Sequence, residues 1–233
     1  MIEAVIFDLD GTLLHREASI KRFATNQYER FYPYFSHIPK KCYVNRFITL
    51  DKRGYVWNDK VYQQMVKEFN VTGITPKQLL TDYLVQFKTN CILFPEVLKL
   101  LEALQERSLK LGIITNGQGP FQMDVIRKTG IFPFMDEVLV SEYEGIKKPD
   151  LEIFRSALDR LQVAAARSIF VGDHPQNDVH PAKKSGMISI WKRDAYWGSA
   201  NADFIIDDMM ELLDIIEDDF ISGCVKSFRA NCI

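Results

Sequence analysis

The sequence predicts an α/β protein built on a parallel sheet, with a helical segment inserted near its start. From Pro95 onward, short apolar runs alternate with segments whose apolar residues recur at helical spacing. Strands that alternate with helices favour a parallel sheet covered on both faces. Residues 15–94 break this rhythm, because they are rich in aromatic side chains and their pattern is mostly helical.

The predicted elements follow the chain in a regular order. Strands are predicted at residues 4–7, 109–114, 138–140, 168–171, 187–191 and 204–206. Helices are predicted at residues 97–104, 122–128, 151–161 and 209–216. Gly130 suits the end of the second of these helices, since glycine is common just past a helix C-terminus. Thr75 and Pro76 predict a helix start within the insertion, as cap and first-turn residue.

These patterns divide the chain into three parts. Residues 1–14 and 95–220 form a discontinuous core domain, residues 15–94 form a helical domain, and residues 221–233 form a C-terminal tail that fits no pattern. A chain of 233 residues is long enough to bury a sizeable core. The sequence shows no internal repeat and no low-complexity segment.

Composition excludes several classes of protein. Apolar residues make up 47% and charged residues 26%, as in an ordinary soluble globular protein. A net charge of -2 gives no reason to expect a nucleic-acid or membrane partner. No apolar run is long enough to span a bilayer, and the N-terminal run lacks the features of a signal peptide. We therefore expect a cytoplasmic protein whose four cysteines (Cys42, Cys91, Cys224 and Cys232) are reduced thiols.

Two carboxylates follow the first predicted strand. Asp8 and Asp10 lie one residue apart, directly before Gly11 and Thr12. Like charges this close repel each other, so the pair indicates a cation or a reaction that uses both groups. A simple surface turn is an alternative, because Asp and Gly favour turns. A calcium loop is not, because its twelfth position would be Ser19 rather than glutamate.

Polar residues of a complementary kind follow the later strands. Thr115 and Asn116 follow the second strand, and Lys148 lies after the third. Asp173 follows the fourth strand, with Asp178 five residues on. The carboxyl ends of parallel strands share one edge of a sheet, and ligands bind there. The carboxylates suit Mg²⁺, and the lysine, hydroxyl and amide suit phosphate oxygens.

Four segments together resemble the motifs of the haloacid dehalogenase superfamily. They are DLDGT at 8–12, IITNG at 113–117, KKPD at 147–150 and VGDHPQND at 171–178. In order and spacing the likeness covers residues 1–14 and about 95–207, and it points to the C1-capped, phosphoglycolate phosphatase-like branch. The resemblance implies a Rossmann-like, doubly wound parallel sheet in which residues 15–94 are the inserted C1 cap.

The resemblance also implies the catalytic roles. Asp8 would be the nucleophile that forms an aspartyl-phosphate, and Asp10 the general acid and then the base. Lys148 would balance the negative charge of nucleophile and phosphate. The groups that bind the phosphoryl group of the substrate would be Thr115, Asn116, Gly117 and Lys148.

The same resemblance implies a set of metal ligands. Mg²⁺ would be held by Asp8, by the backbone carbonyl of Asp10 and by Asp173. Asp178 would act behind these ligands, through a water molecule or through Lys148.

The expected activity is hydrolysis of a small phosphorylated metabolite by a monomer or homodimer. Asp10 favours phosphoryl transfer, since a halide leaving group needs no proton. A sugar-phosphate phosphomutase, a phosphonate hydrolase and a regulatory binding protein on the same fold are the alternatives. No motif in the cap identifies the substrate, although Arg46, Arg53 and Trp57 are candidates for contacting it.

Overall fold

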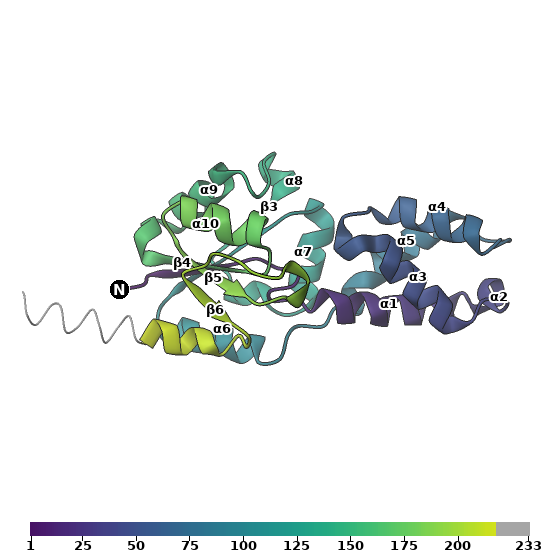
Figure 1. Ribbon diagram of the computed structural model, residues 1–233, viewed down its shortest axis with the longest axis horizontal. Helices are drawn as coiled ribbons and strands as arrows, with labels where there is room; N and C mark the ends of the chain where they lie inside the picture. The colour runs from purple at the N-terminus through teal and green to yellow at the C-terminus, as the bar shows by residue number, and fades with distance from the viewer. Residues whose placement is uncertain (218–233) are drawn as a thin grey trace, which may run out of the picture. The chain divides into compact units, whose positions relative to one another are not determined.

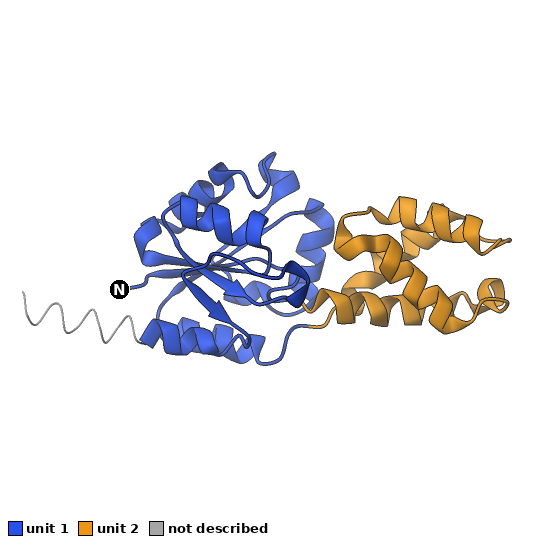
Figure 2. Cartoon of the chain, viewed as in Figure 1, with its two compact units in different colours: residues 1–13, 93–233 blue, residues 14–92 orange. Residues whose placement is uncertain are grey.

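The computed structural model describes residues 1–217, which form two compact units (Figure 1, Figure 2). Unit 1 contains residues 1–13 and the described chain from residue 93, and unit 2 contains residues 14–92. The tail predicted at residues 221–233 lies outside the described residues.

Unit 1 is built on a six-stranded sheet in the order β3-β2-β1-β4-β5-β6, and every pairing is parallel. The strands are β1 (Ala4–Phe7), β2 (Lys110–Thr115), β3 (Glu137–Val140), β4 (Ser168–Gly172), β5 (Ile188–Lys192) and β6 (Phe204–Ile206). The parallel α/β sheet predicted from the sequence is confirmed. Chain order reverses between β1 and β4, and such switch points are where open α/β sheets bind ligands.

The register of the central strands explains why their polar ends meet. Phe7, the last residue of β1, is level with Ile113 of β2 and with Val171 of β4. Asp8 therefore leaves the sheet at the same edge as Thr115 and Gly172. The backbone N–H of Asp8 continues the pairing by donating to the carbonyl of Val171 at 2.9 Å.

Helices cover both faces of this sheet (Figure 1). Those of unit 1 are α6 (Val97–Glu106), α7 (Gly119–Lys128), α8 (Ser141–Glu144), α9 (Leu151–Leu161), α10 (His180–Lys184) and a final helix over residues 211–217. α9 and α10 contact each other on one face, while α6 and the final helix lie on the other. Phe154 of α9 meets Phe170 of β4 edge-to-face, with ring centroids 5.0 Å apart, in a fully buried core.

One predicted helix begins earlier than its apolar spacing suggested. α7 starts at Gly119 rather than at Gln122, because Pro120 occupies its first turn, where a missing N–H costs nothing. This earlier start places Gln122 in the first turn of the helix, close to the end of β2.

Unit 2 consists mainly of helices, in agreement with the helical pattern of residues 15–94. They are α1 (Arg16–Arg30), α2 (Tyr32–Phe35), α3 (Lys40–Asp51), α4 (Asn58–Glu68) and α5 (Pro76–Gln86). Aromatic rings fill the space between them. Phe23 of α1 packs edge-to-face on Tyr83 of α5, with centroids 5.1 Å apart.

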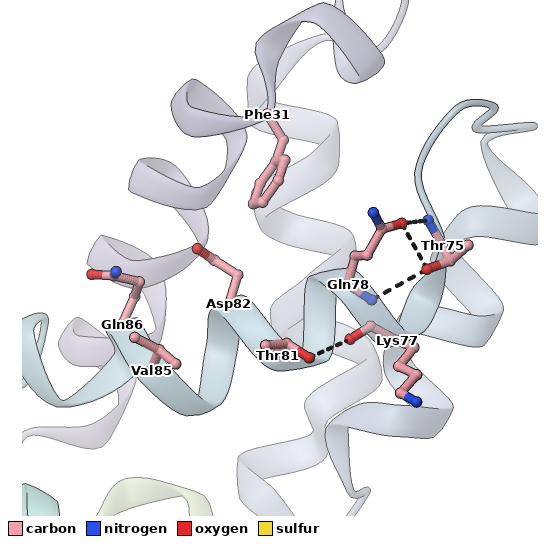
Figure 3. A pocket seen from close by; sticks show the side chains of 8 residues that line it. All are labelled: Phe31, Thr75, Lys77, Gln78, Thr81, Asp82, Val85 and Gln86. Carbon is pink, nitrogen blue, oxygen red and sulfur yellow. Dashed lines mark hydrogen bonds between the residues drawn. The ribbon is translucent and has the colours of Figure 1, made fainter.

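The start of α5 agrees with its sequence signal. Thr75 Oγ1 accepts a hydrogen bond from the Gln78 backbone N–H at 3.3 Å, and Gln78 Oε1 accepts from the Thr75 N–H at 2.9 Å. This reciprocal capping box is visible in Figure 3, beside an open groove whose lining residues all belong to unit 2.

Gln27 joins four helices of unit 2 through one buried side chain. Its Oε1 accepts hydrogen bonds from the hydroxyl groups of Tyr43 and Tyr62, both at 2.9 Å. Its Nε2 donates to the Leu79 carbonyl at 3.1 Å and to Asp82 Oδ2 at 2.9 Å. A buried polar group satisfied in this way fixes the relative positions of the helices that supply its partners.

We predict that Gln27→Met lowers the free energy of unfolding by about 2 to 4 kcal/mol, because two buried tyrosine hydroxyls lose their acceptor. Urea denaturation measures this change. Gln63→Met, at an exposed position of α4, is the matched control and should change stability by less than about 0.5 kcal/mol. Equal stabilities for the two variants would contradict the assignment.

Candidate active site

A lysine held between two carboxylates forms the centre of the site. Lys148 Nζ donates to Asp8 Oδ1 and to Asp178 Oδ1, each at 2.7 Å. All three residues are buried, with exposed fractions of 3% for Lys148, 7% for Asp8 and 1% for Asp178. Asp8 directly follows β1, Asp178 lies in the helical turn after β4, and Lys148 lies in the loop before α9. Sequence reasoning named all three, and the fold brings them together.

Burial and charge act in opposite directions within this cluster. Burial lowers the pKa of Lys148, but its two carboxylate partners more than offset that effect, so the net shift is upward and Lys148 stays protonated. Burial raises the pKa of Asp8 to about 6, against the effect of Lys148 and with a further rise from Asp178. Burial is the largest of these effects on Asp8, and the negative charge of Asp178 adds to it.

The loop after β1 is built around the Asp8 carboxylate. Thr12, which is fully buried, donates from its hydroxyl to Asp8 Oδ2 at 3.2 Å. Gly11 has a φ of +94°, and a Cβ there would lie 2.5 Å from Asp173 Oδ2. Only glycine allows the backbone to turn here and pass so close to Asp173. The DLDGT segment therefore supplies the turn that brings the backbone close to Asp173, as well as two carboxylates.

The loop after β4 brings in the remaining carboxylates. The backbone carbonyl of Asp173 accepts from Trp191 Nε1 at 2.7 Å, which ties this loop to β5. Asp178 lies in a wide helical turn (Pro175–Val179), and its Oδ2 accepts from the His174 N–H at 3.0 Å. The His174 ring in turn accepts from the N–H groups of Gln176 and Asn177. His174 thus shapes the loop that carries Asp178.

The carboxylates of Asp8, Asp173 and Asp178 suit a divalent cation. One oxygen from each residue lies within 4.8 Å of the others, and all three residues are buried. When ionised, these carboxylates and the single ammonium of Lys148 leave a net charge of -2 in a buried space. A hard divalent cation that prefers oxygen ligands would neutralise that charge. The donor set therefore fits a divalent metal ion.

Asp10 and Thr115 meet through a residue that the sequence analysis did not single out. Gln122 Nε2 donates to Asp10 Oδ2 at 2.9 Å, to Thr115 Oγ1 at 3.1 Å and to the Asn116 carbonyl at 3.2 Å. Gln122 is only 5% exposed, and a Cβ on Gly117 would come within 2.9 Å of its Cγ. The only sequence signal was its place five residues after Gly117, at the start of a helix.

The Asn116 side chain is bonded to the backbone of Lys148. Its Nδ2 donates to the Lys148 carbonyl, and its Oδ1 accepts from the Lys148 N–H, both at 2.9 Å. The side chain is therefore used to hold the backbone of Lys148 beside the site. Gly117, also expected to bind substrate, donates its N–H to Ser141 Oγ at 2.9 Å.

The candidate substrate residues of the cap lie in unit 2. Arg46 makes an ion pair with Glu68 on the surface, with Nε donating to Oε2 at 2.6 Å. Arg53 has a φ of +59°, in the left-handed region that is uncommon for a residue with a side chain. The Trp57 ring packs edge-to-face on Tyr83.

Over the described residues, no helix is both long and apolar enough to cross a membrane.

Comparison with known proteins agrees with this architecture. Residues 5–192 match the family model of the haloacid dehalogenase-like hydrolases. The chain belongs to the haloacid dehalogenase-like hydrolase family.

Relatives and solved structures are similar over nearly the whole chain. A glyceraldehyde 3-phosphate phosphatase of Methanocaldococcus jannaschii is 29% identical, covering 93% of this chain and 98% of its own. A phosphoglycolate phosphatase of Vibrio parahaemolyticus is 26% identical, covering 92% and 96%. The crystal structure of a HAD phosphatase from Thermococcus onnurineus is 27% identical, covers 92% and 98%, and has a TM-score of 0.64.

We predict that Lys148→Met destabilises the protein by about 3 to 5 kcal/mol at neutral pH, because it leaves two buried carboxylates without their counter-charge. Loss of the ammonium raises the pKa of Asp8 further, so the folded state holds protons that the unfolded state releases. The difference in unfolding free energy between the unaltered protein and the variant should therefore shrink as the pH falls from about 7 toward 5.

Urea denaturation at several pH values, without added metal, measures this effect. Lys147→Met removes the neighbouring, exposed lysine and is the matched control, with an expected change below about 0.5 kcal/mol. If Lys148→Met lowers the free energy of unfolding by the same amount at every pH, the buried carboxylates are not the cause of the loss of stability.

Proposed function

We propose that the chain is a Mg²⁺-dependent phosphatase that hydrolyses a small phosphomonoester through an aspartyl-phosphate on Asp8. The observation that carries this proposal is the buried Lys148 ammonium bonded to Asp8 Oδ1 at 2.7 Å. A carboxylate can approach a phosphate dianion only where positive charge offsets their repulsion. The phosphatase names of the similar proteins support the same activity.

Asp8 and Asp10 would divide the reaction into two steps. In the first, an Asp8 carboxylate oxygen bonds to phosphorus while the ester P–O bond breaks, and Asp10 gives a proton to the leaving oxygen. In the second, Asp10 takes a proton from water as that water attacks the phosphorus of the aspartyl-phosphate. Free phosphate leaves, and the Asp8 carboxylate is restored.

The neighbouring groups would hold the transferred phosphoryl group. Thr115 Oγ1 already accepts a hydrogen bond from Gln122, so its own proton is suited to a phosphoryl oxygen. Lys148, whose backbone is held by the Asn116 side chain, would supply positive charge to the phosphoryl group. Asp178 keeps Lys148 in place and would assist the reaction through that contact.

The proposed metal ligands are Asp8, the backbone carbonyl of Asp10, and Asp173. When bound, Mg²⁺ would supply charge neutralisation at the phosphoryl oxygens and at the Asp8 carboxylate. Residues 15–94 would act as a cap that selects a small phosphorylated metabolite, and we propose a cytoplasmic setting for the reaction.

A panel of phosphomonoesters tests the proposed activity. It should include glyceraldehyde 3-phosphate, phosphoglycolate and phosphoserine, each assayed for phosphate release with Mg²⁺ and with EDTA. We expect release of phosphate from at least one compound, dependent on Mg²⁺. Transfer of the phosphoryl group to another hydroxyl of the substrate, without free phosphate, would instead indicate a mutase.

We predict that Asp8→Asn lowers kcat by on the order of a thousand-fold or more, because the amide cannot form the covalent intermediate. Steady-state phosphate release measures the loss, and circular dichroism checks the fold. Asp159→Asn, at an exposed position of α9, should keep the activity of the unaltered protein. Substantial turnover by the Asp8→Asn protein would exclude the covalent mechanism.

We predict that Mg²⁺ binding weakens as the pH falls through about 6, because a proton competes with the metal for Asp8. Above this pH Asp8 is ionised in the metal-free protein, and no proton has to leave. Isothermal titration calorimetry between about pH 8 and pH 5 measures the change. An affinity independent of pH over this range would argue against Asp8 as a ligand.

A further inference from the structure

We propose that Gln122 is a positioning residue for the general acid, holding Asp10 so that its catalytic proton lies on Oδ1. This inference rests on the proposed phosphatase function and adds a residue to it. Gln122 Nε2 donates to Asp10 Oδ2 at 2.9 Å, from a buried position in the first turn of α7.

The surroundings determine which way the Gln122 amide points. A glutamine amide can be turned over so that its nitrogen and oxygen exchange places. Here the partners at one end include the Asp10 carboxylate and the Asn116 carbonyl, at 2.9 Å and 3.2 Å. A backbone carbonyl can only accept a hydrogen bond, so the amide nitrogen must face this end. Gln122 is therefore a donor toward Asp10.

A donor at Oδ2 decides which oxygen of Asp10 carries the proton. In a protonated carboxyl group the carbonyl oxygen is the better acceptor, and the hydroxyl is on the other oxygen. With Gln122 donating to Oδ2, the proton belongs on Oδ1. As Asp8 bonds to phosphorus, the ester oxygen leaves with the electron pair of the P–O bond and takes this proton from Oδ1.

The Gln122 amide contacts both the general acid, Asp10, and the Thr115 hydroxyl that would bind the phosphoryl group. Gln122 Nε2 also donates to Thr115 Oγ1 at 3.1 Å, which directs the Thr115 proton away from Gln122. One side chain on α7 thus connects the loop after β1 to the end of β2. Gly117 packs closely against the Gln122 side chain, since a Cβ on Gly117 would lie 2.9 Å from Gln122 Cγ. This close packing keeps the Gln122 amide in place.

Two aryl phosphates separate this role from a merely structural one. Phenyl phosphate and 4-nitrophenyl phosphate are similar in shape, but 4-nitrophenolate leaves readily without a proton, whereas phenolate benefits from general acid catalysis. The comparison uses kcat/KM with Mg²⁺, since this quantity reports transfer to Asp8 and not the later hydrolysis. For Gln122→Met we expect a loss of about 10- to 100-fold with phenyl phosphate and less than about 3-fold with 4-nitrophenyl phosphate.

The ratio of the two rates does not depend on how much of the variant is folded. Gln122→Leu, which also removes the donor, should show the same selective loss and serves if Gln122→Met does not fold. Gln105→Met, at an exposed position of α6, is the control and should leave the ratio unchanged.

An equal loss with both substrates, or no loss with either, would overturn the positioning role. Either result, with the unaltered protein active, leaves the proposed phosphatase standing. Absence of phosphate release by the unaltered protein from these compounds and from the metabolite panel would overturn the proposed function, and this inference with it.

Discussion

The contact of the Lys148 ammonium with Asp8 and Asp178 is the interaction on which the rest of the site depends. Both bonds are 2.7 Å long and lie in a buried space, where unbalanced carboxylates would be costly. The surrounding elements serve this contact. β1 and β4 pair in register, so that Asp8 and the helical turn that carries Asp178 lie at the same edge of the sheet. The Asn116 side chain holds the Lys148 backbone from the end of β2. The same ammonium that offsets the charge of the two buried carboxylates would supply the charge that the proposed reaction needs.

Close packing around glycine makes the arrangement possible. A Cβ on Gly172 would lie 2.4 Å from the Asp178 Cβ, and one on Gly11 would lie 2.5 Å from Asp173 Oδ2. The space at Gly11 lets the loop after β1 pass close to Asp173, and the space at Gly172 lets the segment after β4 fold back so that Asp178 lies beside the strand end. Burial, with the charge of Asp178 added to it, raises the pKa of Asp8. The excess of negative charge in this buried space explains why the site fits a divalent cation.

The sheet and the central cluster could be predicted because strand ends in a parallel sheet share one edge. Asp8, Lys148 and Asp178 were found in this way. Gln122 was not, because a glutamine at a predicted helix start resembles a surface residue. The helix in fact begins three residues earlier, at Gly119, with Pro120 in its first turn. The contact of the Asn116 side chain with the Lys148 backbone could not be predicted either, since it joins positions 32 residues apart.

Detection of the intermediate tests the central claim most directly. The protein would be mixed with a phosphomonoester that it hydrolyses and quenched in acid during turnover. Borohydride reduction and peptide mass spectrometry would then locate the acyl phosphate. We expect a reduced carboxyl group at position 8, dependent on substrate and absent from the Asp8→Asn protein. A modification at another residue, or none while phosphate is being released, would contradict covalent catalysis by Asp8.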